Sequence, residues 1–208
     1  MEIKPGDIVI VNNWNGNFLS SAIRFFTKSW SHTAIGFFPF IDSSSMPEEI
    51  KRFIDEVVNS AKGNIFEANL TVGITDWAKT FNDPDYDVRV YRWIVPLDNL
   101  NDALWTLFDK YNTNIYGAEQ LIWFIWRWIV EKLHLPKRWA IKNFFPNLEV
   151  CTEIIYVALM LLRHPVVKMV LNEQGRDQNT VHPGDIIWIC DRLVEEKMME
   201  VAYNRQRH

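Results

Sequence analysis

The sequence predicts an α+β fold in which an antiparallel sheet packs against a layer of helices. Segments such as GDIVIV at 6–11 and YDVRVYRWIV at 86–95 are rich in β-branched and aromatic residues, as is typical of strands. The segment 151–164 is apolar around most of its circumference, which predicts a central buried helix. No linker rich in Ser, Gly or Pro divides the 208 residues, so we expect one domain over 1–208.

The N-terminal half is expected to supply most of the strands. Pro5-Gly6 is a turn signal before the first strand, and apolar residues at helical spacing predict a helix over 18–30. SWSHTAIGFF at 29–38 then indicates a strand that begins near His32. A polar excursion with a short helix is expected over 43–63, followed by strands at 64–70 and 86–95.

The C-terminal half is expected to be mainly helical. An amphipathic helix is predicted over 99–112, with an apolar face made by five residues: Ala103, Leu104, Leu107, Phe108 and Tyr111. An aromatic helix is expected at about 118–133, before the buried helix at 151–164. HPGDIIWIC at 182–190 is interpreted as a last strand, and 191–206 as an exposed terminal helix.

Composition and charge exclude several classes of protein. A net charge of −4 argues against a nucleic-acid partner, which normally requires a basic face. Two cysteines, with no CxxC or Cys/His cluster, indicate neither a disulfide framework nor a metal site. The N-terminus does not resemble a signal peptide, and the apolar run at 121–130 is shorter than the roughly 20 residues of a membrane span. A reducing, cytoplasmic setting is therefore expected.

Cys151 is the strongest candidate for a reactive group. It opens the predicted buried helix, where unpaired N–H groups and the helix dipole favour a thiolate over a thiol. The same N–H groups can stabilise an oxyanion that forms when sulfur attacks a carbonyl. The alternative is that Cys151 is a small apolar core residue, which is the commoner role of a free cysteine.

His32 and Glu67 are the candidate partners of Cys151. A thiolate nucleophile requires an imidazole that stabilises it and later protonates the leaving group. Ala34 and Gly36, on the same strand face as His32, are small and would leave room for a helix end. Glu67 lies in an apolar strand, where it could accept a hydrogen bond from the imidazole. The alternatives are a core histidine bonded to a backbone carbonyl, and an edge strand with Glu67 facing solvent.

The order His…Glu…Cys resembles the permuted papain-like amidases of the YaeF/YiiX type, relatives of NlpC-type cell-wall peptidases and of lecithin-retinol acyltransferase. The stretches that carry this resemblance run the length of the chain: GDIVIV, SWSHTAIGF, IFEANLTVGI, NIYGAEQL, VCTEIIYVAL and HPGDIIWI. The resemblance implies a circularly permuted papain-like fold without metal or organic cofactor. It also implies that Cys151 is the nucleophile, His32 the base and acid, and Glu67 the orienting group.

Three further residues are expected near the substrate or the oxyanion. The resemblance places Tyr116 where some relatives have a tyrosine that assists the oxyanion, and Thr152 where the family commonly has Ser. Trp30, just before His32, completes this set. The Trp-rich helix at 121–130 has no counterpart in the resemblance, so a pocket that includes it would be particular to this protein.

Two functions of different classes follow from these residues. The first is a cysteine hydrolase or acyltransferase that cleaves a peptide or lipid-linked amide or ester through an acyl-thioenzyme. The second is a non-enzymatic module that binds a membrane surface through the Trp-rich helix and the basic residues Lys137, Arg138 and Lys142. The Cys151, His32 and Glu67 set favours the enzyme, because a pure binding module does not need it. The sequence does not specify an oligomeric state.

Overall fold

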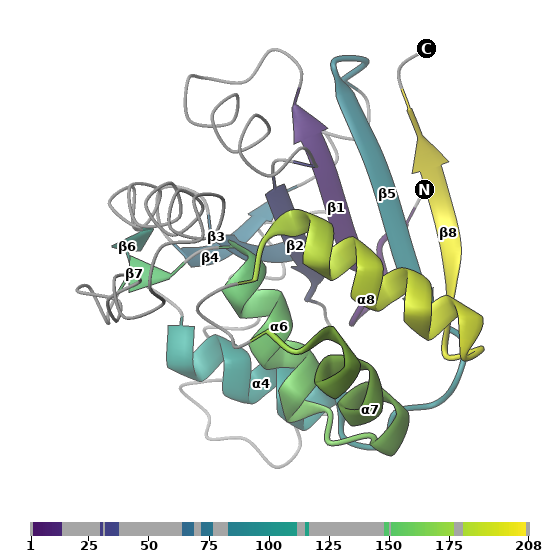
Figure 1. The fold of residues 1–208 in the computed structure, drawn as a ribbon. Helices are drawn as coiled ribbons and strands as arrows, with labels where there is room; N and C mark the ends of the chain where they lie inside the picture. The colour runs from purple at the N-terminus through teal and green to yellow at the C-terminus, as the bar shows by residue number, and fades with distance from the viewer. Residues whose placement is uncertain are drawn as a thin grey trace, which may run out of the picture.

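A six-stranded sheet forms the centre of the molecule, with helices on one face (Figure 1). The structure is a computed structural model that describes residues 2–13, 30, 32–37, 64–68, 72–76, 83–111, 115–116, 148–149, 151–176 and 181–206. The segments 64–68, 72–76, 115–116 and 148–149 are described by their backbone alone.

All neighbouring strands in the six-stranded sheet are antiparallel, which confirms the expected sheet type. The spatial order is β4-β3-β2-β1-β5-β8. The strands are β1 (Ile8–Asn13), β2 (His32–Gly36), β3 (Asn64–Ala68), β4 (Val72–Asp76), β5 (Tyr86–Trp93) and β8 (Met199–Arg205). In the centre of the sheet, Val11 of β1 lies opposite His32 of β2 on one side and opposite Val88 of β5 on the other.

The helices pack on the sheet face that carries Ile8, Ile10 and Ile35. They are α4 (Leu100–Tyr111), α6 (Cys151–Leu161), α7 (Pro165–Gln174) and α8 (Pro183–Glu195). Figure 1 shows α8 running across the sheet, with α6 beside β2. Because strand side chains alternate, Val9, Val11 and Ala34 form a second, separate apolar cluster on the other face. The helix-covered face therefore holds the main core, and Cys151 belongs to it.

The sequence pattern predicted α4 and α6 correctly. In α4 the five residues expected on the apolar face are the buried ones. In α6 every residue from Cys151 to Leu159 is buried, as its apolar circumference predicted. A side chain from the start of α4 joins the two helices, since Asn99 Nδ2 donates a hydrogen bond to the carbonyl of Leu161 at 3.0 Å.

The C-terminal region reverses the predicted order of strand and helix. HPGDIIWIC begins α8, and the strand is β8, at 199–205. His182 caps the helix: its Nδ1 accepts a hydrogen bond from the N–H of Asp185, whose carboxylate accepts one from the N–H of His182. Pro183 at the first helical position fits such a start. The buried residues recur at helical spacing, namely Ile186, Ile189, Cys190 and Leu193, a pattern hidden within an apolar run.

Gly36 allows a close approach of the N-terminal segment, not of a helix end as the sequence suggested. Gly6 N–H donates to the carbonyl of Gly36 at 2.7 Å, and Gly36 N–H donates to the carbonyl of Asp7 at 2.6 Å. A Cβ atom on Gly36 would overlap the carbonyl oxygen of Lys4. The expectation for Ala34 is also wrong, because Ala34 packs in the second apolar cluster, on the face opposite α6.

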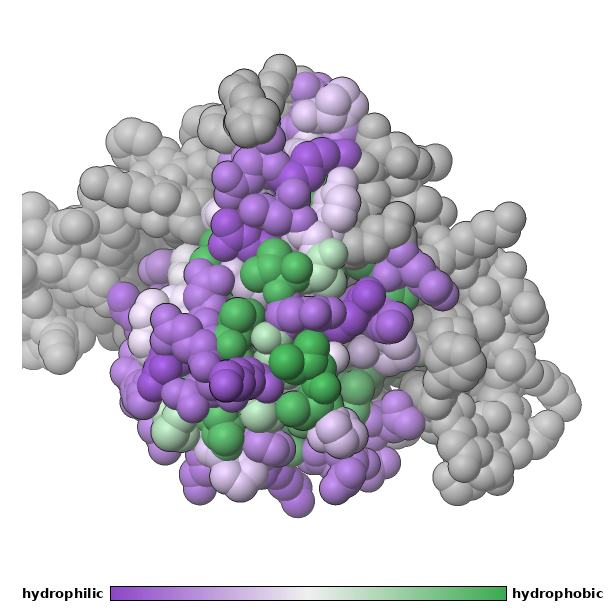
Figure 2. Space-filling view, turned by 90° about the vertical axis from the view of Figure 1, so that its right-hand side faces the viewer, coloured by the Kyte–Doolittle hydropathy of each residue, from purple (hydrophilic) through white to green (hydrophobic). Residues whose placement is uncertain are grey.

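The predicted helix at 118–133, the excursion at 43–63, and the predicted helix at 18–30 except Trp30 lie outside the described residues. Within the described part of the chain, no helix has the length and apolar character needed to cross a membrane. Figure 2 faces the edge of the sheet formed by β8, where hydrophobic side chains surface among hydrophilic ones. This edge is three strands away from β2 and hence from His32.

Candidate active site around Cys151

The thiol of Cys151 is 4% exposed at the first residue of α6. Burial by itself raises the pKa of this thiol, because it disfavours the charged form. The charge of His32, a hydrogen bond with its side chain, and hydrogen bonding from Thr33 act in the opposite direction and outweigh burial. The net pKa of Cys151 is therefore below that of an ordinary thiol.

The structure thus brings Cys151 and His32 together, although they are far apart in the sequence. Strand alternation alone would turn His32 toward the face of Ala34, away from α6. However, His32 is the first residue of β2, and the described pairing of β2 with β3 involves only Ile35 and Gly36. The start of β2 therefore lies beyond the residues that pair with β3. There the side chain of His32 can reach the sulfur of Cys151 at the start of α6.

Thr33 is a residue of the site that the sequence analysis missed. Its side chain is 0% exposed, and it lies opposite Ile10, on the face covered by α6. Thr33 Oγ1 makes no hydrogen bond of ordinary geometry, although the hydroxyl is close enough to Cys151 to lower the pKa of the thiol. The available signal was a hydroxyl residue directly after His32 in an otherwise apolar strand.

Glu67 is located by strand register, because β3 is described by its backbone alone. Phe66 pairs with Ile35, and Glu67 pairs with Gly73 of β4. Since β2 and β3 are antiparallel, Glu67 lies one position beyond Phe66, toward the end of β2 that carries His32. The alternative of an edge strand is wrong, because β3 has a neighbour on each side.

Tyr116 belongs to a short parallel pair of strands that leads directly to Cys151. β6 (Ile115–Tyr116) pairs with β7 (Leu148–Glu149), and Tyr116 lies opposite Glu149. Only Val150 separates β7 from Cys151. The backbone at Tyr116 is therefore held next to the segment that enters α6.

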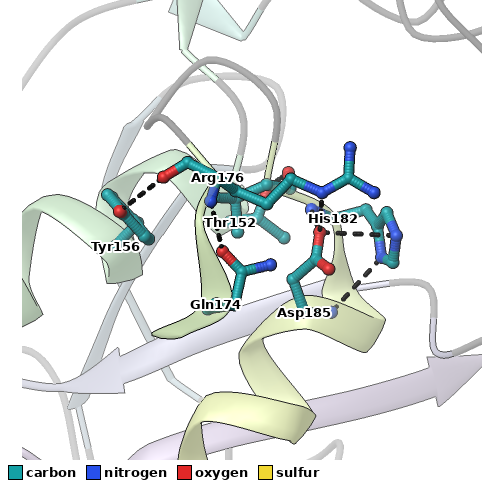
Figure 3. A network of polar contacts seen from close by, with 7 residues as sticks. Thr152, Tyr156, Gln174, Arg176, His182 and Asp185 are labelled. Atoms are coloured by element: carbon teal, nitrogen blue, oxygen red, sulfur yellow. Dashed lines mark hydrogen bonds and ion pairs between the residues drawn. The ribbon is translucent and has the colours of Figure 1, made fainter. Parts of the chain in front are cut away.

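Thr152 has a structural partner for its hydroxyl. Thr152 Oγ1 donates a hydrogen bond to the carbonyl of Val181 at 2.8 Å, within the polar network of Figure 3. In the same network, Tyr156 Oη donates to the carbonyl of Arg176 at 2.7 Å, and Arg176 Nε lies 3.9 Å from Asp185 Oδ2. These contacts hold the first turns of α6 against the segment before α8. The side chain of Thr152 thus anchors the helix that carries Cys151.

Trp30 is held against β5. Its partly buried ring packs on the main core, and the guanidinium of Arg89 lies over the ring at 5.6 Å from the centroid. Arg89 Nη1 donates to Tyr91 Oη at 3.1 Å, and Tyr91 Oη donates to Asp191 Oδ1 at 2.6 Å. The described contacts of Trp30 are therefore with a charged group of β5 and with the core.

Cys190 behaves as a core residue. It is 0% exposed in α8, and burial, followed by the charge of Asp191, raises the pKa of its thiol well above the ordinary value. Both cysteines are free. The other described histidines, His164 and His182, are the N-caps of α7 and α8.

Among the described residues, no group of three or more His, Cys, Asp or Glu side chains could hold a metal ion. No protein-family model matches the chain, and no curated protein matches it. The chemistry of the site is therefore inferred from its own residues. These are a buried thiol with a lowered pKa, an adjacent imidazole, and N–H groups at a helix start.

Proposed function

We propose that the chain is a cysteine-dependent hydrolase or acyltransferase that cleaves an amide or ester bond through an acyl-thioenzyme. One observation carries this proposal: Cys151 is buried, yet the neighbouring His32 and Thr33 hold the pKa of its thiol below the ordinary value. Buried thiols normally have raised pKa values, as Cys190 does. A lowered pKa together with a specific imidazole partner is typical of a nucleophile.

The proposed reaction has two steps. The thiolate of Cys151 forms a bond to the carbonyl carbon, and the carbon–nitrogen or carbon–oxygen bond breaks as His32 gives its proton to the leaving amine or alcohol. Water, or a second acceptor, then loses a proton to His32 and attacks the thioester, which releases the acyl group and restores the thiol. The first N–H groups of α6, including that of Thr152, are suited to hold the oxyanion because the first N–H groups of a helix have no acceptor within the helix itself.

Glu67 and Tyr116 have supporting places in this proposal. Glu67, on the strand next to β2, would accept a hydrogen bond from His32 and fix the orientation of its ring. Tyr116, at the register position opposite Glu149, would assist the oxyanion. Trp30 and its Arg89 partner would border the substrate. The permuted papain-like arrangement belongs to the same proposal, supported by an antiparallel sheet with Cys151 opening the helix beside β2.

The substrate is proposed as a peptide or lipid-linked amide or ester, with the reaction in a reducing, cytoplasmic setting where both cysteines stay free. HPGDIIWI adds nothing to the family resemblance as a strand, because it forms α8. The resemblance therefore depends on the stretches around β1, His32, Glu67, Tyr116 and Cys151.

Trapping of the acyl-enzyme tests the proposal. The purified chain would be incubated with p-nitrophenyl acetate, and acetylated peptides would be located by mass spectrometry. We expect one acetyl group on Cys151, with nitrophenol release that is lost in Cys151→Ala and reduced by about 10²-fold or more in His32→Ala. Cys190→Ala is the matched control and should still acetylate at Cys151. Acetylation elsewhere, or release that Cys151→Ala leaves unchanged, would contradict the proposal.

A further inference from the structure

Thr33 is one of three residues with a buried side-chain atom that lacks a hydrogen bond in the part of the chain that the structure describes. The other two differ from it, because each bonds through another atom. Asn12 Nδ2 donates to Asp87 Oδ2 at 3.3 Å, and Arg89 Nη1 donates to Tyr91 Oη. Thr33 has only its hydroxyl, so its one polar side-chain atom is left without a regular hydrogen bond.

A buried hydroxyl without a partner costs free energy, and buried polar groups are nearly always satisfied. Valine has the shape of threonine without the hydroxyl, and the residue opposite Thr33 on the same face of the sheet is the apolar Ile10. Packing alone would therefore be served better by valine at position 33. The hydroxyl needs another explanation, and the reactive group that it acts on is the sulfur of Cys151.

We infer that Thr33 is a thiolate-stabilising residue, whose hydroxyl donates a hydrogen bond to the sulfur of Cys151 when that sulfur is an anion. A hydroxyl can rotate about its C–O bond, so its proton turns toward the sulfur once the thiol proton has moved to His32. Hydrogen bonds to charged groups are shorter and stronger than those between neutral groups. The hydroxyl is therefore satisfied in the charged form of the site and unsatisfied in the neutral form.

This arrangement adds to the role proposed for His32, and it rests on the proposed function. An imidazolium stabilises a neighbouring thiolate through charge and is then consumed as a proton donor to the leaving group. Thr33 loses no proton in the reaction, so it can stabilise the sulfur anion again when the thioester is cleaved. Its backbone acts on the same atom, since hydrogen bonding from the Thr33 backbone also lowers the pKa of Cys151.

The pH dependence of alkylation tests this role. The full chain would be treated with iodoacetamide from pH 5 to pH 10, and the rate at Cys151 would be followed by peptide mass spectrometry. Thr33→Val should raise the midpoint of the rate profile by about one pH unit, because a hydrogen bond to the charged form is lost. Thr33→Ser keeps the hydroxyl and should leave the midpoint close to that of the unmodified sequence.

Thr106→Val is the matched control, because its hydroxyl lies on the exposed face of α4 and donates to the carbonyl of Asp102. If Thr33→Val does not fold, Thr33→Ala compared with Thr33→Ser makes the same test. If the midpoint of the unmodified chain is lower than that of an ordinary thiol, and Thr33→Val or Thr33→Ala does not raise it, the role of Thr33 is overturned but the proposed function is not. An ordinary thiol midpoint in the unmodified chain would instead overturn the proposed function.

Discussion

Cys151 and Cys190 are both buried in the main core cluster, but the pKa values of their thiols are displaced in opposite directions. Burial disfavours the charged form of both thiols and so raises both pKa values. Interactions with His32 and Thr33 reverse the effect at Cys151, whereas the charge of Asp191 adds to it at Cys190. The neighbours of a thiol, and not its burial alone, therefore decide the direction in which its pKa moves.

The first prediction concerns the reactivity of these two thiols. At neutral pH we expect iodoacetamide to modify Cys151 in the native chain, because a lowered pKa leaves a larger fraction of reactive thiolate. Cys190 should remain unmodified until the chain is unfolded in urea. Peptide mass spectrometry after short exposure measures both sites in one sample. Equal rates at the two cysteines in the native chain would contradict the prediction.

The second prediction concerns stability at alkaline pH. Burial and the hydrogen bond to Asp191 raise the pKa of Tyr91, and burial raises that of Cys190. Above the unfolded values of about 10 for a phenol and about 8.5 for a thiol, unfolding releases a proton. The free energy of unfolding should then fall with rising pH, by up to about 1.4 kcal/mol per unit for each group.

Cys151 contributes to the pH dependence of the free energy of unfolding with the opposite sign. Its lowered pKa stabilises the fold fully above about pH 8.5, and this contribution disappears as the pH falls through the folded value.

Urea unfolding of Tyr91→Phe between pH 7 and pH 11 isolates the contribution of the Tyr91 phenol. The stability difference between this variant and the unmodified chain should shrink above about pH 10. A difference that stays constant over this range would show that Tyr91 ionises equally in both states.

The third prediction concerns the ion pair that anchors the start of β1. Arg92 donates from Nε to Asp7 Oδ1 at 3.0 Å and from Nη2 to Asp7 Oδ2 at 2.6 Å, and Asp7 is 1% exposed. Arg92→Ala leaves that carboxylate buried with less support, so we expect a loss of about 3 kcal/mol in the free energy of unfolding. Urea denaturation measures it.

Arg192→Ala is the control for removal of an arginine. Arg192 forms its ion pairs on the surface of α8, with Glu173, Glu195 and Glu196, and exposed pairs contribute little. We expect a much smaller change in stability than for Arg92→Ala. Similar losses for the two variants would mean that the burial of Asp7 is not the source of the effect.

The fourth prediction concerns the contact between Gly36 and the N-terminal segment. Gly36→Ala places a methyl group on the carbonyl oxygen of Lys4, so the segment must move or the variant must lose about 3 kcal/mol of stability. Gly175→Ala is the comparison, because a Cβ there has space and meets only the cost of its positive φ, roughly 1 kcal/mol. Thermal unfolding followed by circular dichroism measures both. A larger loss in Gly175→Ala would contradict the steric argument.

The elements that the sequence predicted correctly are those whose periodicity is unambiguous. The apolar residues of α4 repeat at helical spacing, and those in the first part of β5, namely Tyr86, Val88 and Val90, alternate with polar residues. The prediction of a strand at 182–190 was wrong because a short apolar run is compatible with either a strand or a buried helix. There the decisive features were local, namely the cap made by His182 and the proline after it. In the similar PGDI at 5–8, Pro5 and Gly6 instead form a turn before β1, and Gly6 N–H donates a hydrogen bond to the carbonyl of Gly36.

By itself, the sequence determined the residue types of the site and the local structure of most of it: a cysteine opening an apolar helix, and a histidine opening a strand. These are properties of neighbours in the chain, and periodicity and helix-start chemistry reveal them. The tertiary structure alone decided that the two meet, that Thr33 joins them, and that the hydroxyl of Thr152 is turned to Val181. Such contacts depend on how α6 lies on β2, and that packing is determined by apolar surfaces drawn from the whole chain.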